Sequence, residues 1–297
     1  MTLAETIKEI TRKHLTQNNG MLLGQCITAV GWVNGTVPDC ENIVELPMTD
    51  VAGAGFAVGI ALTGRRPVFV LRFQDFFTLN CNQFVHFAAI CKQLHDVSVP
   101  VFIRCISMDN AGPVHSIVLH NIPMYFPGLT VMAPITPGEY ESTWEYYMQH
   151  DDPMFVSEHR RCYPINYEMK DEDSADADIV LFGISDARIN MMEAADRLRK
   201  EGVNVSIRHI YRLKPFDADY YAKALEGKKY GLVIDNGFPI CGTARDFAYM
   251  LMERTDSRVY ALSCEDKVKC FNEADKNATP SADTIYNKVI EILGDQL

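Results

Sequence analysis

Short apolar segments alternate with longer helix-like segments along nearly the whole chain, and this alternation restricts the fold more than any other feature of the sequence. In the second half, strand-like segments at 179–183, 203–210, 230–235 and 258–262 alternate with helix-like segments at 187–201, 218–226, 243–254 and 282–293. In the first half, helix-like and strand-like segments follow one another at 3–16, 21–24, 52–61, 68–73, 82–95, 99–107, 129–133, 137–150 and 154–158. Strands that alternate with helices form parallel sheets that are covered on both faces. The sequence therefore predicts an α/β fold of the doubly wound type.

An acidic segment at 167–178, YEMKDEDSADAD, separates the two halves. It contains almost no large apolar residues, so it cannot bury enough surface to join a core. A chain of 297 residues is long enough for two domains with separate cores. We therefore predict two doubly wound domains, 1–166 and 179–297, each a mostly parallel sheet with helices on both faces, joined by an acidic linker at 167–178.

Charge and hydropathy exclude several classes of function. A net charge of −11 repels nucleic acids and anionic membrane surfaces. Residues 1–14 are charged and amphipathic, unlike a secretion signal. No apolar run approaches the about 18–20 residues that cross a bilayer. The sequence predicts a cytoplasmic protein that binds neither nucleic acid nor membrane.

The segment 46–77, LPMTDVAGAGFAVGIALTGRRPVFVLRFQDFF, is the most unusual part of the sequence. It reads as an acidic turn, a Gly- and Ala-rich helix at 52–61, a Gly-Arg-Arg-Pro turn, a buried strand at 68–73 and an aromatic pair. Each Gly in a helix costs about 1 kcal/mol relative to Ala, so such a helix usually lets another group approach its backbone closely. A tight contact between helix and sheet is the alternative explanation.

The order of these features resembles the pyrimidine-binding domain of thiamine-diphosphate enzymes of the transketolase type. The resemblance is closest to the β-subunit of the first component of 2-oxo acid dehydrogenase complexes and to the C-terminal half of transketolases. The motifs that carry it are Pro47-Met48-Thr49-Asp50, Gly55-Phe56-Ala57-Val58-Gly59, Gly64-Arg65-Arg66-Pro67 and Asp75-Phe76-Phe77. The family has Glu where this chain has Asp50.

Two motifs in the second half are similar to the C-terminal domain that transketolases and the dehydrogenase β-subunits share. They are RLKPFD at 212–217 and LVIDNGFPICG at 232–242, in which Asp235 stands where Glu is more usual. Doubly wound domains host many functions, so the fold alone assigns none. The resemblance implies that this domain packs in a dimer and forms a wall of the active-site funnel.

The resemblance implies that Asp50 activates the cofactor. In the family, a carboxylic acid in a fairly dry site hydrogen-bonds the N1′ atom of the aminopyrimidine and favours the tautomer that removes the C2 proton. Asp is one methylene shorter than Glu, which displaces the carboxyl by about 1.5 Å, enough to affect catalysis. A helix N-cap is the alternative role, because Thr49-Asp50 before a helix is a favourable cap. The resemblance also places Gln25 and Gly53 at the cofactor.

An aromatic residue and two histidines extend the predicted site. Phe76 falls where the family stacks a ring on the aminopyrimidine, although aromatic residues at strand ends are also common in cores. The segment 112–115, Gly-Pro-Val-His, resembles a transketolase motif, and histidine is able to move protons during carbonyl addition. We predict that His115 is catalytic and binds substrate. His120 is a further substrate-binding candidate that packing explains equally well.

Arg160 is the predicted anion-binding residue. Transketolases place an Arg after the corresponding strand to hold the substrate phosphate, and the planar guanidinium suits that role. The dehydrogenase β-subunits instead have a Glu before this point, which Glu158 matches. Ile103 replaces another phosphate-facing His of transketolases, which weakens the argument for a sugar phosphate. A solvated strand end or an intersubunit salt bridge is the alternative role of Arg160.

One part of the family's cofactor site is missing from the sequence. The family anchors the diphosphate through Mg²⁺ with a Gly-Asp-Gly motif, and this sequence contains no such motif. It also contains no Cys-x-x-Cys pair, so we predict no metal ligands on this chain. The resemblance implies that a separate α-type subunit holds the diphosphate and the Mg²⁺. The implied assembly is an α₂β₂ heterotetramer with active sites at the α–β interfaces.

Three functions remain open from the sequence. The first is the small subunit of a split, transketolase-like transferase that moves a two-carbon ketol unit from a ketose, which His115 and Arg160 favour. The second is the β-subunit of a 2-oxo acid dehydrogenase or decarboxylase, which Glu158 and the length of the chain favour. The third is a non-catalytic partner that stabilises an α-type subunit. We favour the first of these.

Overall fold

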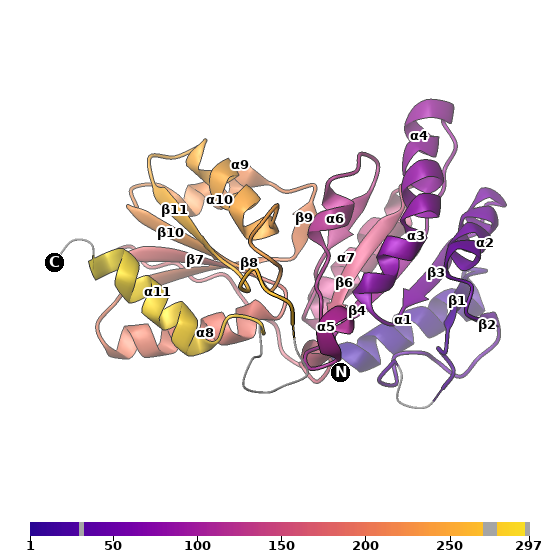
Figure 1. Cartoon of the computed structure of the whole chain (residues 1–297), viewed down its shortest axis with the longest axis horizontal. Helices are drawn as coiled ribbons and strands as arrows, with labels where there is room; N and C mark the ends of the chain where they lie inside the picture. Colours follow the sequence, from indigo (N-terminus) through magenta and orange to yellow (C-terminus); the bar gives the residue numbers. More distant parts are fainter. Residues whose placement is uncertain (30–32, 270–277, 295–297) are drawn as a thin grey trace. The chain divides into compact units, whose positions relative to one another are not determined.

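The computed structural model describes residues 1–29, 33–269 and 278–294 of the chain. The chain forms two compact units (Figure 1). The first consists of Met1–Glu168 with Arg212–Pro215, and the second of Met169–Tyr211 with Phe216–Leu297. The predicted second domain also contains 270–277 and 295–297, which lie outside the described residues.

The first unit is a sheet with helices on both sides (Figure 1). Its elements are α1 (Leu3–Gln17), β1 (Met21–Gln25), β2 (Ile43–Leu46), α2 (Asp50–Leu62), β3 (Pro67–Leu71), η1 (Gln74–Phe76), α3 (Phe77–Gln83), the π-helical turn η2 (Phe84–Ala88), α4 (Ala89–His95), β4 (Phe102–Ser107), α5 (Gly112–His115), α6 (Asn121–Met124), β5 (Thr130–Met132), α7 (Pro137–Gln149), β6 (Met154–His159), η3 (Arg160–Cys162) and β9 (Arg212–Lys214). Within the described residues, the strand order is β2-β1-β3-β4-β6-β5-β9, and all neighbours are parallel except β5 and β9.

The central strands explain why this sheet is parallel. Strands β3, β4 and β6 are buried along their whole length. Strands that are buried along their whole length need cover on both faces, which crossover helices provide. Helix α1 packs against α7, and α2 packs against α3 and η2.

The second unit repeats this organisation on a smaller scale. Its elements are β7 (Ile179–Ile184), α8 (Ala187–Lys200), β8 (Val205–Ile210), α9 (Ala218–Ala222), η4 (Lys223–Leu225), β10 (Tyr230–Ile234), α10 (Thr243–Met252), β11 (Arg258–Leu262) and α11 (Ala282–Gly294). Its described strands are all parallel, in the order β11-β10-β7-β8. Helix α8 packs against α11, and α9 packs against α10. The predicted α/β fold with two mostly parallel sheets is therefore confirmed.

Two strands of the first unit were not predicted. Strand β2 is short and only half-buried at one edge of the sheet. Strand β9 forms the opposite edge, although its residues follow β8 in the sequence. It pairs antiparallel with β5, with Lys214 opposite Val131. The first unit therefore takes its last strand from the second half of the chain.

The predicted acidic linker, 167–178, spans the point where the two units divide. Glu172 forms an antiparallel bridge with Ile207, and the Asp171 carboxylate accepts a hydrogen bond from the His209 N–H at 2.8 Å. Much of this segment is therefore attached to the second unit. None of the helices in the described part of the chain combines the length and the apolar character that a bilayer crossing requires.

Candidate functional site

A cavity in the first unit brings together most of the predicted cofactor-binding residues. The residues that line it are Gln25, Asp50, Phe69, Val70, Leu71, Arg72 and Phe76. It lies where β1 and β3 end, and ligands of open α/β sheets bind at the carboxyl ends of parallel strands. Its volume is about 10 Å³, the space of about one water molecule. Complete small-molecule pockets have about 300–1,000 Å³, so these residues form only part of a pocket.

Gln25 caps the helix that begins with Asp50. The N-cap residue of α2 is Thr49, whose side chain makes no capping hydrogen bond. The Gln25 carboxamide, with its oxygen toward the helix, accepts hydrogen bonds from the N–H groups of Thr49 at 3.0 Å and Asp50 at 3.2 Å. Asp50 itself is the first helical residue. The helix is therefore capped by Gln25 and not by Asp50, whose side chain lines the cavity.

Gly53 has a packing role. A Cβ atom there would lie 3.1 Å from Leu46 Cδ1 and 3.6 Å from Phe69 Cε2. The missing side chain therefore allows α2 to approach β2 and β3 closely. Gly53 is not among the residues that line the cavity. The tight contact between helix and sheet, which the sequence left as an alternative, explains this glycine.

An aromatic cluster joins His115 to the cavity. The His115 ring stacks on Phe73, with centroids 4.1 Å apart and an interplanar angle of 12°. It also contacts Phe76 edge-on at 5.3 Å. His115 Nδ1 lies 3.0 and 3.2 Å from the two carboxylate oxygens of Asp75. Because Phe76 also lines the cavity, His115 and the cavity belong to one continuous region.

Two arginines border the same cluster. The guanidinium carbons of Arg160 and Arg72 lie 5.2 and 5.9 Å from the Phe73 ring centroid, within cation–π range. Arg160 Nη2 also donates to the Arg72 carbonyl at 3.5 Å. Burial lowers the pKa of Arg160, although a guanidinium stays charged in proteins. Sequence reasoning missed Arg72, although a charge directly after a buried apolar strand was a visible signal.

His120 lies in a buried network. Its side chain is 1% exposed, and its Nδ1 lies 3.3 Å from Ser157 Oγ. Ser157 Oγ accepts from Gln74 Nε2 at 2.8 Å. Gln74 Oε1 in turn accepts from the Leu119 N–H at 2.8 Å. This burial favours packing, the alternative that the sequence left open, over direct contact with a substrate.

Glu158 is a buried structural acid. Arg104 Nε and Nη2 donate to its two carboxylate oxygens at 2.7 and 2.8 Å. The hydroxyls of Tyr140 and Tyr163 also donate to it, at 3.1 and 2.7 Å. Burial, together with the negative charge of Glu158, raises the pKa of both tyrosines well above the usual value. Both hydroxyls therefore remain protonated donors, and Glu158 is not among the residues that line the cavity.

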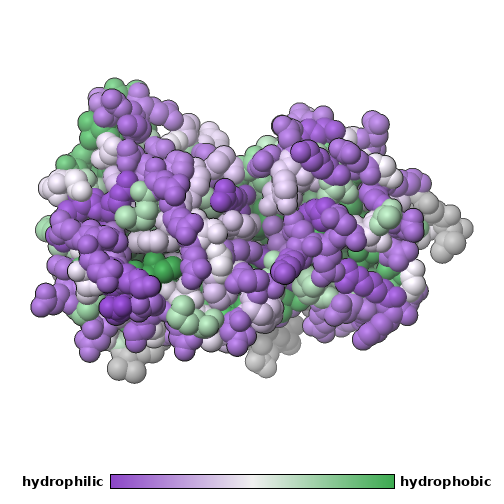
Figure 2. Space-filling view, turned by 180° about the vertical axis from the view of Figure 1, so that it is seen from behind, coloured by the Kyte–Doolittle hydropathy of each residue, from purple (hydrophilic) through white to green (hydrophobic). Residues whose placement is uncertain are grey.

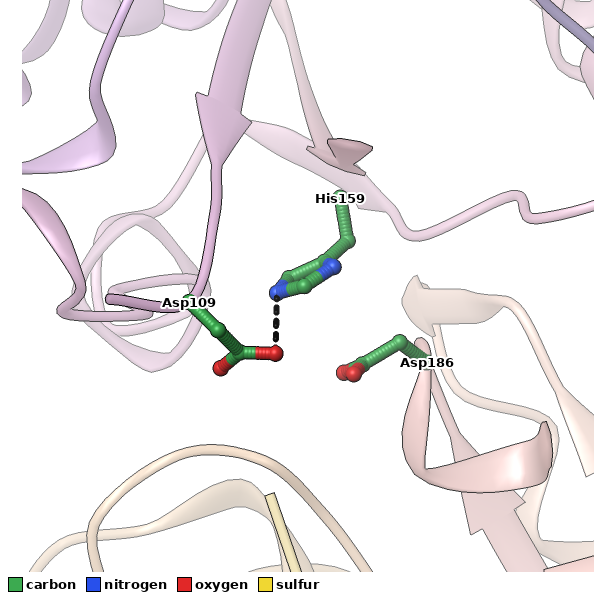
Figure 3. Close-up of side chains that lie close together, drawn as sticks. All are labelled: Asp109, His159 and Asp186. Carbon is green, nitrogen blue, oxygen red and sulfur yellow. Dashed lines mark ion pairs between the residues drawn. The ribbon is translucent and has the colours of Figure 1, made fainter. Parts of the chain in front are cut away.

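His159 and Asp109 add an acid and a base that sequence reasoning missed. His159 ends β6, and Asp109 lies shortly after the neighbouring strand β4. His159 Nε2 is 3.9 Å from Asp109 Oδ2 (Figure 3). His159 Nδ1 accepts from the Arg161 N–H at 3.3 Å, so Nε2 carries the proton of the neutral ring. The pair lies beside Arg160, at the carboxyl edge of the sheet.

The amino-acid sequence matches two family models in order. Residues 15–166 match the transketolase pyrimidine-binding domain, and residues 170–285 match the transketolase C-terminal domain. These ranges follow the division into two units, except for the segment that contains β9.

Individual relatives have low sequence identity but long alignments. The chain is 27% identical to acetoin:2,6-dichlorophenolindophenol oxidoreductase subunit beta from Cupriavidus necator, over 83% of this chain and 76% of that protein. It is 23% identical to pyruvate dehydrogenase E1 component subunit beta from Staphylococcus aureus, over 99% and 98%. Among solved structures, a split-gene transketolase in an inactive β4 tetramer has a TM-score of 0.77 at 15% identity, over 99% and 98%. This last likeness concerns the fold.

Proposed function

Because the chain belongs to the transketolase-like family of thiamine-diphosphate-dependent enzymes, we propose that it is the β-type subunit of a two-subunit enzyme that acts on a small 2-oxo acid or on acetoin. The observation that carries this proposal is the cavity that joins Asp50, Gln25 and Phe76. The names of the relatives support 2-oxo acid or acetoin chemistry over the two-carbon ketol transfer that the sequence favoured. We therefore propose the second of the three functions that the sequence left open, in preference to the transketolase-like transferase.

The residues around the cavity fit the aminopyrimidine end of thiamine diphosphate. Asp50 offers a carboxyl group that shares a proton with a ring nitrogen, Phe76 offers an aromatic face, and Val70 and Leu71 supply apolar walls. When bound, the cofactor supplies a nucleophilic carbon for addition to a carbonyl. The incomplete volume of the cavity supports a site that a second subunit completes.

The chain's own side chains have distinct roles in this proposal. Asp50 holds the ring nitrogen, and the Gln25 cap fixes the backbone from which Asp50 projects. His115 exchanges a proton with the reacting group of the substrate during carbonyl addition. Arg160 attracts the carboxylate of a 2-oxo acid. His120 and Gly53 support the site through packing.

An apolar surface on the first unit supports the need for a partner. Exposed large apolar side chains line two neighbouring helical segments, α2 and η2–α4. We call this the α2–α4 surface, and its residues are Val51, Phe56, Leu62, Phe87, Ile90 and Leu94. Figure 2 shows hydrophobic residues at the upper left, over the end of the unit that carries α4. Large exposed apolar patches mark interaction sites.

The proposed occupant of the α2–α4 surface is the α-type subunit. Helix α2 carries exposed apolar residues on one side and Asp50 at its N-terminus. A partner that covers α2 therefore reaches the cavity as well. Gly59 of α2 supports close approach, because a Cβ atom there would have no neighbour within 4 Å. In this proposal the partner holds the diphosphate and most Mg²⁺ ligands, and the assembly is an α₂β₂ heterotetramer.

Calorimetric titration with thiamine diphosphate and Mg²⁺ tests the proposal. The chain is co-expressed with an α-type subunit, and the complex is compared with the chain alone and with a complex that contains Asp50→Ala. We expect binding only by the complexes, and loss of turnover in the variant. A folded complex that binds no cofactor would overturn the proposal.

A substrate panel separates the alternatives. We expect turnover of a 2-oxo acid or acetoin. Transfer from a ketose phosphate instead would favour the transketolase-like function, which the approach of both His115 and Arg160 to Phe73 supports. Full turnover in the Asp50→Ala complex would favour a non-catalytic partner.

A further inference from the structure

Asp75 holds one ring nitrogen of His115. The two residues are 40 positions apart, at η1 after β3 and at the end of α5. His115 Nδ1 lies 3.0 Å from Asp75 Oδ1 and 3.2 Å from Oδ2. An ionised carboxylate only accepts hydrogen bonds, so Nδ1 must donate and carry a hydrogen. In the neutral ring, Nε2 is then the nitrogen with a lone pair.

Aromatic contacts fix the plane of the same ring. Phe73 stacks on His115 nearly parallel, and Phe76 meets it edge-on. Rotation of the ring about its bond to Cβ would break the stack on Phe73 and the hydrogen bond to Asp75 together. Phe73, Asp75 and Phe76 all belong to the short segment 73–76. This one segment therefore determines both the orientation and the tautomer of His115.

The neighbouring residue anchors the segment that follows His115. Gln74 is fully buried, and its Oε1 accepts from the Leu119 N–H at 2.8 Å. Its Nε2 donates to Ser157 Oγ at 2.8 Å and to the Cys105 carbonyl at 3.2 Å. The His115 side chain is thus held on a segment that is itself attached to β4 and β6. Support of this kind holds a reacting group in a productive geometry.

We infer that Asp75 is a positioning residue that places the hydrogen of His115 on Nδ1 and leaves Nε2 as the nitrogen that reacts. The inference rests on the proposed function, because it specifies how His115 acts in that reaction. A carboxylate that holds one imidazole nitrogen fixes which of the two nitrogens exchanges protons with the substrate. Asp75 touches neither cofactor nor substrate in this role, and acts through His115.

Nitrogen NMR of histidine-labelled protein tests the inference without turnover. The full chain is labelled with ¹⁵N at histidine and compared with Asp75→Asn and Asp75→Ala, and the His115 signals are assigned with His115→Gln. We expect the Nδ1–H tautomer in the wild type and a shift toward Nε2–H in Asp75→Ala. In Asp75→Asn we expect a mixture, because a carboxamide both donates and accepts. An unchanged tautomer in both variants would overturn the inference.

Kinetics of the complex with the α-type subunit supply the second readout. We expect kcat to fall about 10- to 1,000-fold in Asp75→Asn, with the Kd for thiamine diphosphate changed less than about threefold. Asp96→Asn is the matched control, because it removes an Asp charge from a surface ion pair whose Asp96 side chain is 91% exposed. We expect the control to match the wild type. A changed tautomer with unchanged kcat would overturn the positioning role.

The experiments separate a wrong inference about Asp75 from a wrong proposed function. A wild-type complex that binds no cofactor refutes the proposed function, and the catalytic part of the inference with it. A wild-type complex that turns over substrate, with the same kcat in Asp75→Asn, refutes the inference alone. If Asp75→Ala does not fold, the nearly isosteric Asp75→Asn still decides between these outcomes.

Discussion

Arg104 and Glu158 form a two-point ion pair in the interior of the first unit, with side chains that are 0% and 1% exposed. They lie on the neighbouring strands β4 and β6. Tyr140 from α7 and Tyr163 after η3 also donate to Glu158. Glu158 thus links β4, α7 and the segment after η3 to β6, the strand that ends at His159 next to Arg160.

Glu158→Gln is expected to destabilise the protein strongly. Removal of one partner of a buried ion pair leaves an uncompensated charge, which typically costs about 3–5 kcal/mol. Urea unfolding at pH 7 measures the free energy of unfolding. The control is Asp151→Asn, which breaks a half-exposed pair with Arg66 and should cost less than about 1 kcal/mol. Equal losses in the two variants would contradict a structural role for Glu158.

Gln25→Met is expected to loosen the start of α2. The variant loses both hydrogen bonds to the N–H groups of Thr49 and Asp50, and loss of a cap costs about 0.5–2 kcal/mol. We expect a raised Kd for thiamine diphosphate, measured by calorimetry on the complex. Gln25→Glu keeps an acceptor and adds a charge that a helix N-terminus favours, so it should retain helix stability. A Kd that does not change in Gln25→Met would contradict the role of the cap.

Phe56→Asp or Leu94→Asp should weaken association with the α-type subunit. Both residues lie on the α2–α4 surface and are exposed in the chain alone. Truncation of a central interface residue costs about 2 kcal/mol or more, which raises Kd about 30-fold. Sedimentation of mixed subunits measures the change. Tyr167→Asp, at an exposed position of the same unit, should have no effect on association. Normal association of both variants would place the partner elsewhere.

Acid should destabilise the second unit through His209. Burial, aided by the charge of Arg188, lowers the pKa of His209 to about 3, whereas histidine in an unfolded chain titrates near 6.5. Between these values the unfolded state binds a proton that the folded state excludes. The free energy of unfolding therefore falls as pH drops below about 6.5, by up to about 1.4 kcal/mol per pH unit.

His209→Asn isolates this contribution. Asn keeps an acceptor for Arg188 Nε, which donates to His209 Nδ1 at 3.1 Å, and it does not titrate. From pH 7.5 to pH 5, the wild type should lose about 2 kcal/mol more than the variant in urea unfolding. Other buried groups, such as His14, whose pKa burial lowers as well, are the same in both proteins. The difference between the wild type and the variant therefore excludes their contribution to the pH dependence. Parallel pH profiles of the two proteins would refute the assignment to His209.

The sequence predicted the helices and strands that can be recognised from their own residues, without knowledge of distant contacts. Apolar residues marked β3 along its whole length and β4 and β6 at their starts, although β4 and β6 also bury the charged Arg104 and Glu158. Strand β2 was missed because it is a half-buried edge strand of four residues. Strand β9 was missed because its three residues form a strand only through pairing with the distant strand β5.

The site residues also divide into those that the order of the motifs predicted and those whose role depends on contacts between distant residues. The order of motifs predicted that Asp50 and Phe76 lie together, and both line the cavity. Asp75 belongs to one of these motifs, but the motif does not show its contact with His115, which is 40 positions away. Gly53 occupies a motif position, but only the structure shows that it packs closely against Leu46 and Phe69.

Because β9 comes from the second half of the chain, the sheet of the first unit is completed late during synthesis. Domains generally fold as units while the ribosome is still extending the chain. The sheet of the first unit cannot be completed until Arg212–Lys214 has been translated, after the whole of β7, α8 and β8. During that interval β5 presents an open edge, and open edges pair with foreign strands. A nascent chain of this protein therefore passes through a stage in which chaperone protection of β5 matters most.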